Sequence, residues 1–176
     1  MTHVSPCVVT GQVDSPVQMR KDLKGDYMIS KILVPTDGSK TAQKAARYAV
    51  DLAKQLKASI IVLSVFDKSS SIGWASSDAF VTPRELESVE SSLKEAAMKH
   101  GEAVKKRCDK HGIQSKTIIT TGHPVEAIVK EAKRSKADLI VMGSHGRSAL
   151  AAAVLGSVAY GVMHRDMNIP VLVVKR

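Results

Sequence analysis

Five short apolar runs, each rich in β-branched residues, alternate along this chain with segments of helical periodicity. The runs lie at 32–34, 60–65, 117–121, 138–142 and 171–174. Between the first two, Ala42, Ala46 and Ala49 recur about every 3.6 residues, which is typical of a helix that buries one face. Strands that alternate with helices join as parallel neighbours through right-handed crossovers. We therefore predict an α/β fold in which a five-stranded, mostly parallel sheet carries helices on both faces.

The chain is long enough for one well-packed domain and too short for two of ordinary size, with 176 residues and 44% apolar content. Residues 1–27 show no sustained period and are interrupted by Ser5-Pro6, Gly11 and Ser15-Pro16. We predict that 1–27 form a flexible N-terminal extension and that the folded domain comprises 28–176. The sequence leaves open whether Met28 is an alternative translation start.

Residues with strong positional preferences mark the expected helix ends. Ser39 is predicted to cap the first helix, Gly112 to end a long amphipathic helix, and Pro124 to begin the next one. The long helix is expected to follow a loop at 69–77 and to bury Cys108. A last helix is predicted over about 155–164.

A glycine pattern directly follows the fourth apolar run. Gly143 and Gly146 are followed after nine residues by Gly156 and Ser157. Glycine lets the backbone approach a ligand closely, and a helix start adds unpaired N–H donors, so this pattern favours phosphate binding. The alternative is that the glycines only make a turn. The spacing matches neither the P-loop nor the dinucleotide fingerprint, which excludes both of those sites.

In a parallel sheet, the segments after the other strands contribute to the same site. The first strand ends in Pro35, Thr36 and Asp37, and the Asp37 carboxylate suits a ribose hydroxyl or a metal-held water. An Asx turn that merely starts the helix explains Asp37 equally well. At the end of the second strand, near Val65, backbone groups can read the edge of an adenine.

Several classes of protein are disfavoured by the sequence. No apolar stretch of about 18 residues is present to span a bilayer, and the N-terminus does not resemble a signal peptide, so we expect a cytoplasmic protein without membrane association. Cys7 and Cys108 lie too far apart in sequence, without histidine partners, to indicate a disulfide framework or a zinc site.

The formal net charge of +9 raises the question of nucleic-acid binding. In the most basic region, 94–110, lysines and arginines alternate with Glu95, Glu102 and Asp109 on a helical period. No aromatic side chains interleave there for base stacking. We interpret this region as a solvated helix face and regard nucleic acid as an unlikely partner.

Five motifs together resemble the universal stress protein family of UspA type. They are KILVPTDGS at 31–39, IVLSV at 61–65, VMGSHGRS at 141–148, LGSV at 155–158 and PVLVV at 170–174. The resemblance covers 28–176 and implies a flavodoxin-like or Rossmann-like domain. It also implies the ATP-binding branch of the family, whose motif G-x2-G-x9-G-[ST] is present here, and a homodimer formed through the strand at 171–174 at the sheet edge.

The resemblance further implies a binding site for ATP, or ADP or AMP, together with Mg. The residues that would border this adenine nucleotide are Pro35, Thr36, Asp37, Val65, Met142, Gly143, Gly146, Arg147, Gly156, Ser157 and Val158. Asp37 would contact the ribose or a metal-held water, and Val65 would face the adenine. Met142 and Gly143 would border the ribose and first phosphate, and the outer phosphates would be held by Gly146, Gly156, Ser157 and Val158. The chain departs from the family at 149–153, where ALAAA replaces the usual glycine and basic residues that favour a triphosphate.

No paired carboxylates and no nucleophile with an adjacent base can be assembled from the sequence, so we do not expect an efficient enzyme. His145 is interpreted as a positioning or exposed residue. The predicted function is that of an ATP-binding universal stress protein, a nucleotide-dependent stress-response or signalling module with at most slow hydrolysis. The alternatives are a Mg-dependent ATP-hydrolysing enzyme that uses Asp37, and a dimeric module that acts without nucleotide.

Overall fold

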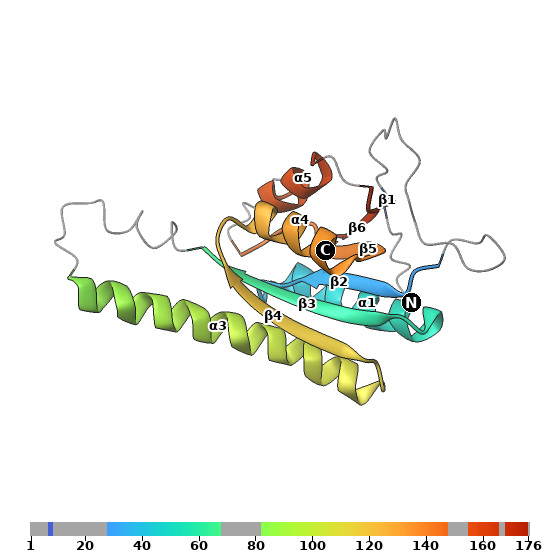
Figure 1. Ribbon diagram of the computed structural model, residues 1–176, viewed down its shortest axis with the longest axis horizontal. Helices are drawn as coiled ribbons and strands as arrows, with labels where there is room; N and C mark the ends of the chain where they lie inside the picture. Colours follow the sequence, from blue (N-terminus) through green and yellow to red (C-terminus); the bar gives the residue numbers. More distant parts are fainter. Residues whose placement is uncertain (1–6, 9–27, 68–81, 148–154, 166–167, 176) are drawn as a thin grey trace.

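The computed structural model describes residues 7–8, 28–67, 82–147, 155–165 and 168–175. In these ranges, six strands form one sheet in the order β1-β6-β5-β2-β3-β4 (Figure 1). The strands are β1 (Cys7–Val8), β2 (Lys31–Pro35), β3 (Ser59–Phe66), β4 (Ser115–Thr121), β5 (Leu139–Gly143) and β6 (Val171–Val174). The five strands from β6 to β4 are mutually parallel, which confirms the predicted α/β fold. The loop predicted at 69–77 lies outside the described residues.

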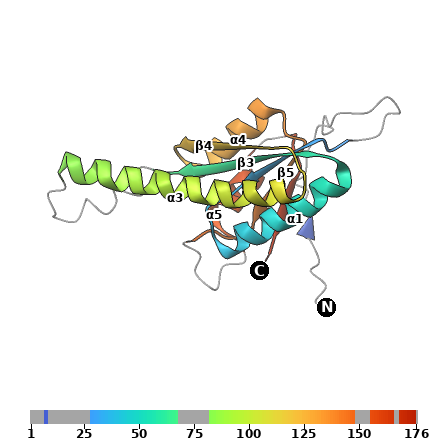
Figure 2. The same cartoon turned by 90° about the horizontal axis from the view of Figure 1, so that it is seen from below.

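The helices cover both faces of the sheet, as predicted. They are α1 (Lys40–Leu56), α3 (Pro83–Lys110), α4 (Pro124–Ser135) and α5 (Ser157–Met163). Helices α1 and α3 lie on one face and α4 and α5 on the other (Figures 1 and 2). Helix α3 packs on β3 and β4, and its amino-terminal half extends beyond the sheet (Figure 2).

Successive residues of each central strand supply two separate cores. Ile32 and Val34 of β2 belong to the cluster that includes Ala49 of α1, whereas Leu33 belongs to the cluster that includes Ile128 of α4. All three strand residues are fully buried. Because β2 is covered on both faces, it requires an unbroken apolar run, and this is the signal that made it recognisable in the sequence.

The helix ends agree with the sequence predictions. The Ser39 side chain accepts a hydrogen bond from the N–H of Ala42 and caps α1. Pro124 is the first residue of α4. Helix α3 ends at Lys110, two residues before Gly112, whose φ of +66° stops the helix in the left-handed region.

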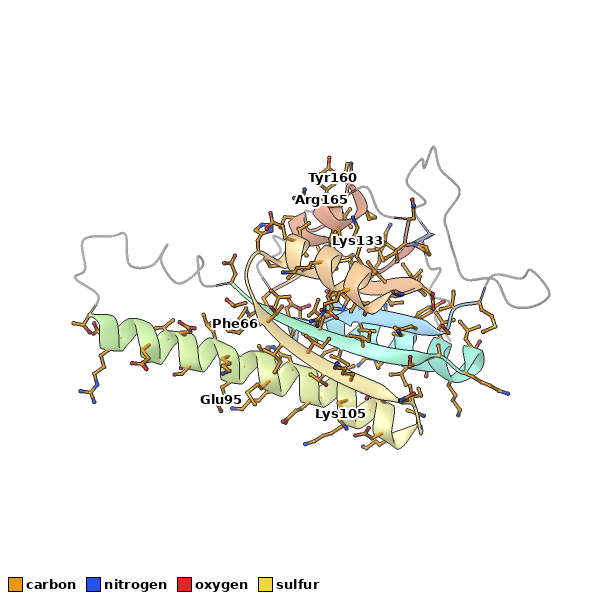
Figure 3. All side chains as sticks on the ribbon, in the orientation of Figure 1. Phe66, Glu95, Lys105, Lys133, Tyr160 and Arg165 are labelled. Carbon is orange, nitrogen blue, oxygen red and sulfur yellow. The ribbon has the colours of Figure 1, made fainter. Side chains whose placement is uncertain are left out.

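The charged side chains of α3 form ion pairs along its outer surface. Lys99 Nζ lies 2.7 Å from Glu95 Oε1, and Lys105 Nζ lies 2.9 Å from Asp109 Oδ2. Glu95 and Lys105 point away from the sheet (Figure 3). These i,i+4 pairs are what the interpretation as a solvated helix face requires. No helix in the described ranges is both long and apolar enough to cross a membrane.

The sequence-based expectation that β6 forms the sheet edge is wrong. Strand β1 pairs antiparallel with the outer side of β6, with Cys7 opposite Val173 and Val8 opposite Leu172. The edge strand thus comes from the segment interpreted as an extension, which has no period long enough to reveal a two-residue strand. Pairing at β6 satisfies backbone groups that would otherwise be left open at an apolar edge.

Candidate functional site

A cavity of about 440 Å³ lies beyond the carboxyl ends of β2, β3 and β5. The strand order reverses here, because the chain runs from β2 outward to β4 and then returns to β5 on the other side of β2. Open α/β sheets bind ligands at such a point because the loops of two adjacent strands leave in opposite directions. The cavity is lined by every site residue that the sequence predicted: Pro35, Thr36, Asp37, Val65, Met142, Gly143, Gly146, Arg147, Gly156, Ser157 and Val158.

The loop between β2 and α1 is fixed by the sheet and by its own side chains. The N–H of Thr36 donates to Leu63 O at 2.8 Å, which continues the pairing of β2 with β3. The Asp37 Oδ1 atom accepts a hydrogen bond from the N–H of Ser39 at 3.0 Å. This is the Asx turn that the sequence offered as one explanation of Asp37.

Asp37 also contacts the glycine loop, 143–147. Its Oδ2 atom accepts a hydrogen bond from the N–H of Arg147 at 3.0 Å. A Cβ atom on Gly146 would lie 2.9 Å from the same oxygen, so glycine is needed for this close approach. The carboxylate therefore joins the two loops that border the cavity. Nothing in the sequence indicates this contact.

The first glycine of the loop is required by packing against α1. A Cβ atom on Gly143 would lie 2.8 Å from the backbone of Thr41 and Ala42, which cannot move without displacing the helix. The hydroxyl groups of Ser39 and Thr41 both donate to the carbonyl of His145. The glycine loop is thus attached to the first turn of α1 before any ligand binds.

Ser144 and His145 form a pair that orients the imidazole. The Ser144 Oγ atom lies 2.9 Å from His145 Nδ1. Ser144 is completely buried, and its N–H donates to Val174 O at 2.9 Å. A buried hydroxyl cannot attack a ligand, so this pair positions the ring at the cavity wall rather than supplying a nucleophile.

The last glycine of the pattern connects the loop to α5. The N–H of Gly156 donates to Ser144 O at 2.7 Å, and a Cβ atom on Gly156 would lie 3.1 Å from that oxygen and 3.2 Å from the Cα of His145. Helix α5 begins at the next residue, Ser157. The spacing of nine residues in the sequence thus corresponds to a direct contact between Gly156 and the loop.

One wall of the cavity was not anticipated from the sequence. It is formed by α3 through Leu93, Ala96, Ala97 and His100. Leu93 and Ala97 are four residues apart and so lie on one side of α3, the side that an amphipathic helix buries, but nothing in the sequence indicates that this side also faces a cavity. His100 is the polar member of this wall, and its position depends entirely on how α3 packs against the sheet.

The His100 ring lies directly against the β2–α1 loop. A Cβ atom on Gly38 would lie 2.3 Å from both Cδ2 and Nε2 of the imidazole. Gly38 also has a φ of +78°, a conformation that other residues adopt at a cost. Glycine at position 38 therefore serves both the turn that presents Asp37 and the packing of α3.

The cavity combines an apolar part with polar groups of both signs. Val65, Phe66 and Leu93 lie at the side formed by β3 and α3, and Figure 3 shows Phe66 at the end of its strand. Asp37 and Arg147 lie at the side formed by the loops. Within the described ranges, no three His, Cys, Asp or Glu side chains gather closely enough to hold a metal ion by themselves.

Comparisons with known proteins bear on this site. Residues 28–175 match the family model described as "Universal stress protein family". The chain is 36% identical over 152 residues to universal stress protein MJ0531 of Methanocaldococcus jannaschii, a match that covers 86% of this chain and 85% of that protein. It is 40% identical over 159 residues to MJ0577 of the same organism, covering 85% of this chain and 96% of the relative.

Solved structures show the same fold. The MJ0577 structure, described as a structure-based assignment of biochemical function, matches with a TM-score of 0.72 at 36% identity and covers 85% of this chain and 97% of that one. A universal stress protein crystallised in complex with cAMP matches with a TM-score of 0.56 at 26% identity, covering 84% and 98%. That protein therefore binds an adenine nucleotide.

Proposed function

Because this chain belongs to the universal stress protein family, we propose that it binds an adenine nucleotide and acts as a nucleotide-dependent stress-response or signalling module. The proposed ligand is ATP, ADP or AMP, and hydrolysis is at most slow. The proposed setting is the cytoplasm, as expected from the sequence. The relative that binds cAMP supports an adenine ligand for this fold.

The observation that carries the proposal is that residues of four of the five sequence motifs line one cavity. Its volume of about 440 Å³ falls within the range of small-ligand sites, roughly 300–1,000 Å³. The proposed arrangement has the adenine beside Val65, the ribose beside Asp37 and Met142, and the phosphates beside Gly146 and Gly156. This order follows the change from apolar to polar lining along the cavity.

Magnesium fits this site only when a nucleotide brings it. Mg²⁺ keeps several waters and uses one or two carboxylates together with substrate phosphates, and Asp37 and Asp67 are the acidic side chains at the cavity wall. When bound, the cation would neutralise phosphate charge. The protein's own part is to orient the nucleoside and to present backbone N–H groups.

The direct test is mass spectrometry of nucleotide that remains bound through purification, followed by thermal denaturation with ATP, ADP and AMP. At ten times its dissociation constant a ligand stabilises the protein by about 1.4 kcal/mol. For a domain of this size, that raises Tm by roughly 3–6 °C. Absence of any shift at millimolar concentrations of all three would contradict the proposal.

Matched variants test whether the glycine loop is responsible. A branched side chain at Gly146 would crowd Asp37 Oδ2, and one at Gly156 would crowd the backbone of Ser144 and His145. Gly146→Val and Gly156→Val should therefore displace the loop to which phosphate is proposed to bind, and both should lose nucleotide-induced stabilisation while the far-UV circular dichroism stays unchanged. Ala103→Val, at an exposed position of α3, is the control and should bind as the parent does. If both glycine variants bind like the control, the pattern is only a turn.

The proposed homodimer through Val171–Val174 requires that β1 first leave its place beside β6. Strand β1 pairs with β6 at Leu172 and Val173, so a second copy can pair along the full strand only after β1 is displaced. A two-residue strand forms few hydrogen bonds and is a weak competitor. Sedimentation velocity at micromolar concentration tests the dimer independently of the nucleotide site.

A further inference from the structure

The glycine loop already has a negatively charged group bound to one of its amides. The Asp37 Oδ2 atom accepts the hydrogen bond of the Arg147 N–H at 3.0 Å and would lie 2.9 Å from a Cβ atom on Gly146. Its other oxygen accepts the N–H of Ser39 at 3.0 Å. Both oxygens of one carboxylate therefore accept hydrogen bonds from backbone amides, one in the β2–α1 loop and one in the glycine loop.

The rest of the loop is fixed in the same conformation by neutral contacts. The Ser39 hydroxyl donates to His145 O at 3.3 Å, and the Thr41 hydroxyl donates to the same carbonyl. The N–H of Gly156 donates to Ser144 O at 2.7 Å. These contacts hold the loop without Asp37, so the loop does not need the carboxylate charge to keep its shape.

A phosphate group on this loop would lie beside the Asp37 carboxylate. Two negative groups that lie side by side repel strongly in a partly enclosed cavity, because the effective dielectric constant there is well below that of water. The repulsion increases with the charge on the phosphates. It is small for a monophosphate and large for a metal-free triphosphate, and a divalent cation bound to the phosphates would offset it.

We propose that Asp37 is a specificity-determining residue that selects nucleotides by phosphate charge. It admits nucleotides that carry little phosphate charge or whose charge is neutralised by a divalent cation, and it disfavours metal-free di- and triphosphates. This inference rests on the proposed function, since it concerns which nucleotide the same cavity accepts. It assigns to Asp37 a repulsive role in addition to any contact with the ribose.

The test is isothermal titration of the full chain with adenosine, AMP, ATP in EDTA and ATP with excess Mg²⁺ at low ionic strength. For the parent we expect AMP to bind at least tenfold more tightly than metal-free ATP, and Mg²⁺ to remove most of that difference. Asp37→Asn keeps one acceptor oxygen and removes the charge. Relative to adenosine, whose affinity reports any ribose contact, this variant should bind metal-free ATP about tenfold more tightly than the parent does.

Asp51→Asn removes a carboxylate from an exposed position of α1 and is the matched control, which should behave as the parent. An unchanged ratio of metal-free ATP to adenosine affinity in Asp37→Asn would show a simple ribose contact and overturn the inference. Weaker binding of Mg-ATP alone would show a metal ligand and also overturn it. If Asp37→Asn does not fold, the ratio of AMP to metal-free ATP affinity in the parent decides alone. Binding of none of the four ligands would refute the proposed function itself.

Discussion

Replacing Gly38 by alanine tests whether the packing of α3 and the loop that carries Asp37 depend on each other. We expect two separate contributions to the loss of folding stability at this position. Gly38 has a φ of +78°, and a non-glycine residue in the left-handed region costs about 1–2 kcal/mol. The new Cβ would also lie 2.3 Å from two atoms of the His100 ring, so the ring must leave its present position.

Gly112 provides a matched control. Its φ is +66°, and a Cβ atom there meets nothing within 4 Å, so Gly112→Ala has only the backbone cost. We expect a loss of about 1 kcal/mol for Gly112→Ala, because alanine also lowers the entropy of the unfolded chain. For Gly38→Ala we expect about 2–3 kcal/mol, because displacing a packed ring from its rotamer adds about 0.5–1.5 kcal/mol and lost contacts add more. The corresponding decreases in Tm are about 2–4 °C and about 5–10 °C.

The free energy of unfolding is measured by urea denaturation for Gly38→Ala, Gly112→Ala, His100→Ala and the double variant of Gly38→Ala with His100→Ala. In the His100→Ala background the ring is absent, so Gly38→Ala should cost about as much as Gly112→Ala does in the parent. The resulting coupling energy of about 1–2 kcal/mol between Gly38 and His100 is typical of residues in contact. Equal costs for Gly38→Ala with and without the His100 ring would refute the described packing of α3 on the loop.

Four further outcomes are expected. Asp138 Oδ2 accepts hydrogen bonds from two backbone N–H groups and one hydroxyl group of residues 30–31. Asp138→Ala should therefore lower the free energy of unfolding, measured by urea denaturation, by about 2–3 kcal/mol. A loss below about 0.5 kcal/mol would contradict this role. Burial raises the pKa of the Cys108 thiol above its ordinary value of 9.0. In a Cys7→Ser background, Cys108 should therefore react with a disulfide reagent far more slowly in the folded protein than in the unfolded protein. Because the unfolded thiol ionises first, the free energy of unfolding should fall as pH rises above about 9; equal thiol reactivity in both states would refute the burial. Val8→Pro should weaken β1 and raise the dimer fraction in sedimentation, whereas an unchanged fraction would mean that β1 does not compete for β6.

The sequence by itself determined the helices and strands from β2 to β6 and their order. The apolar run of β2 is recognisable because a strand buried on both faces admits no polar residue, and Ser39 and Pro124 act on the few residues next to them. The glycine pattern was also recognisable from the sequence, because its members lie close together along the chain. The residues around the cavity followed because parallel strands bring their carboxyl ends to one edge of the sheet. Whether they bind a nucleotide remains a prediction.

Only the tertiary structure decided which distant residues touch. The contact of His100 with Gly38, the hydrogen bond from Arg147 to Asp37 and the pairing of β1 with β6 join positions far apart in the chain. None of them leaves a periodic or local signal, because each depends on the angle and register at which whole elements pack. A helix period shows that one side of α3 is buried, but the sheet and the neighbouring loop decide that part of this side faces a cavity.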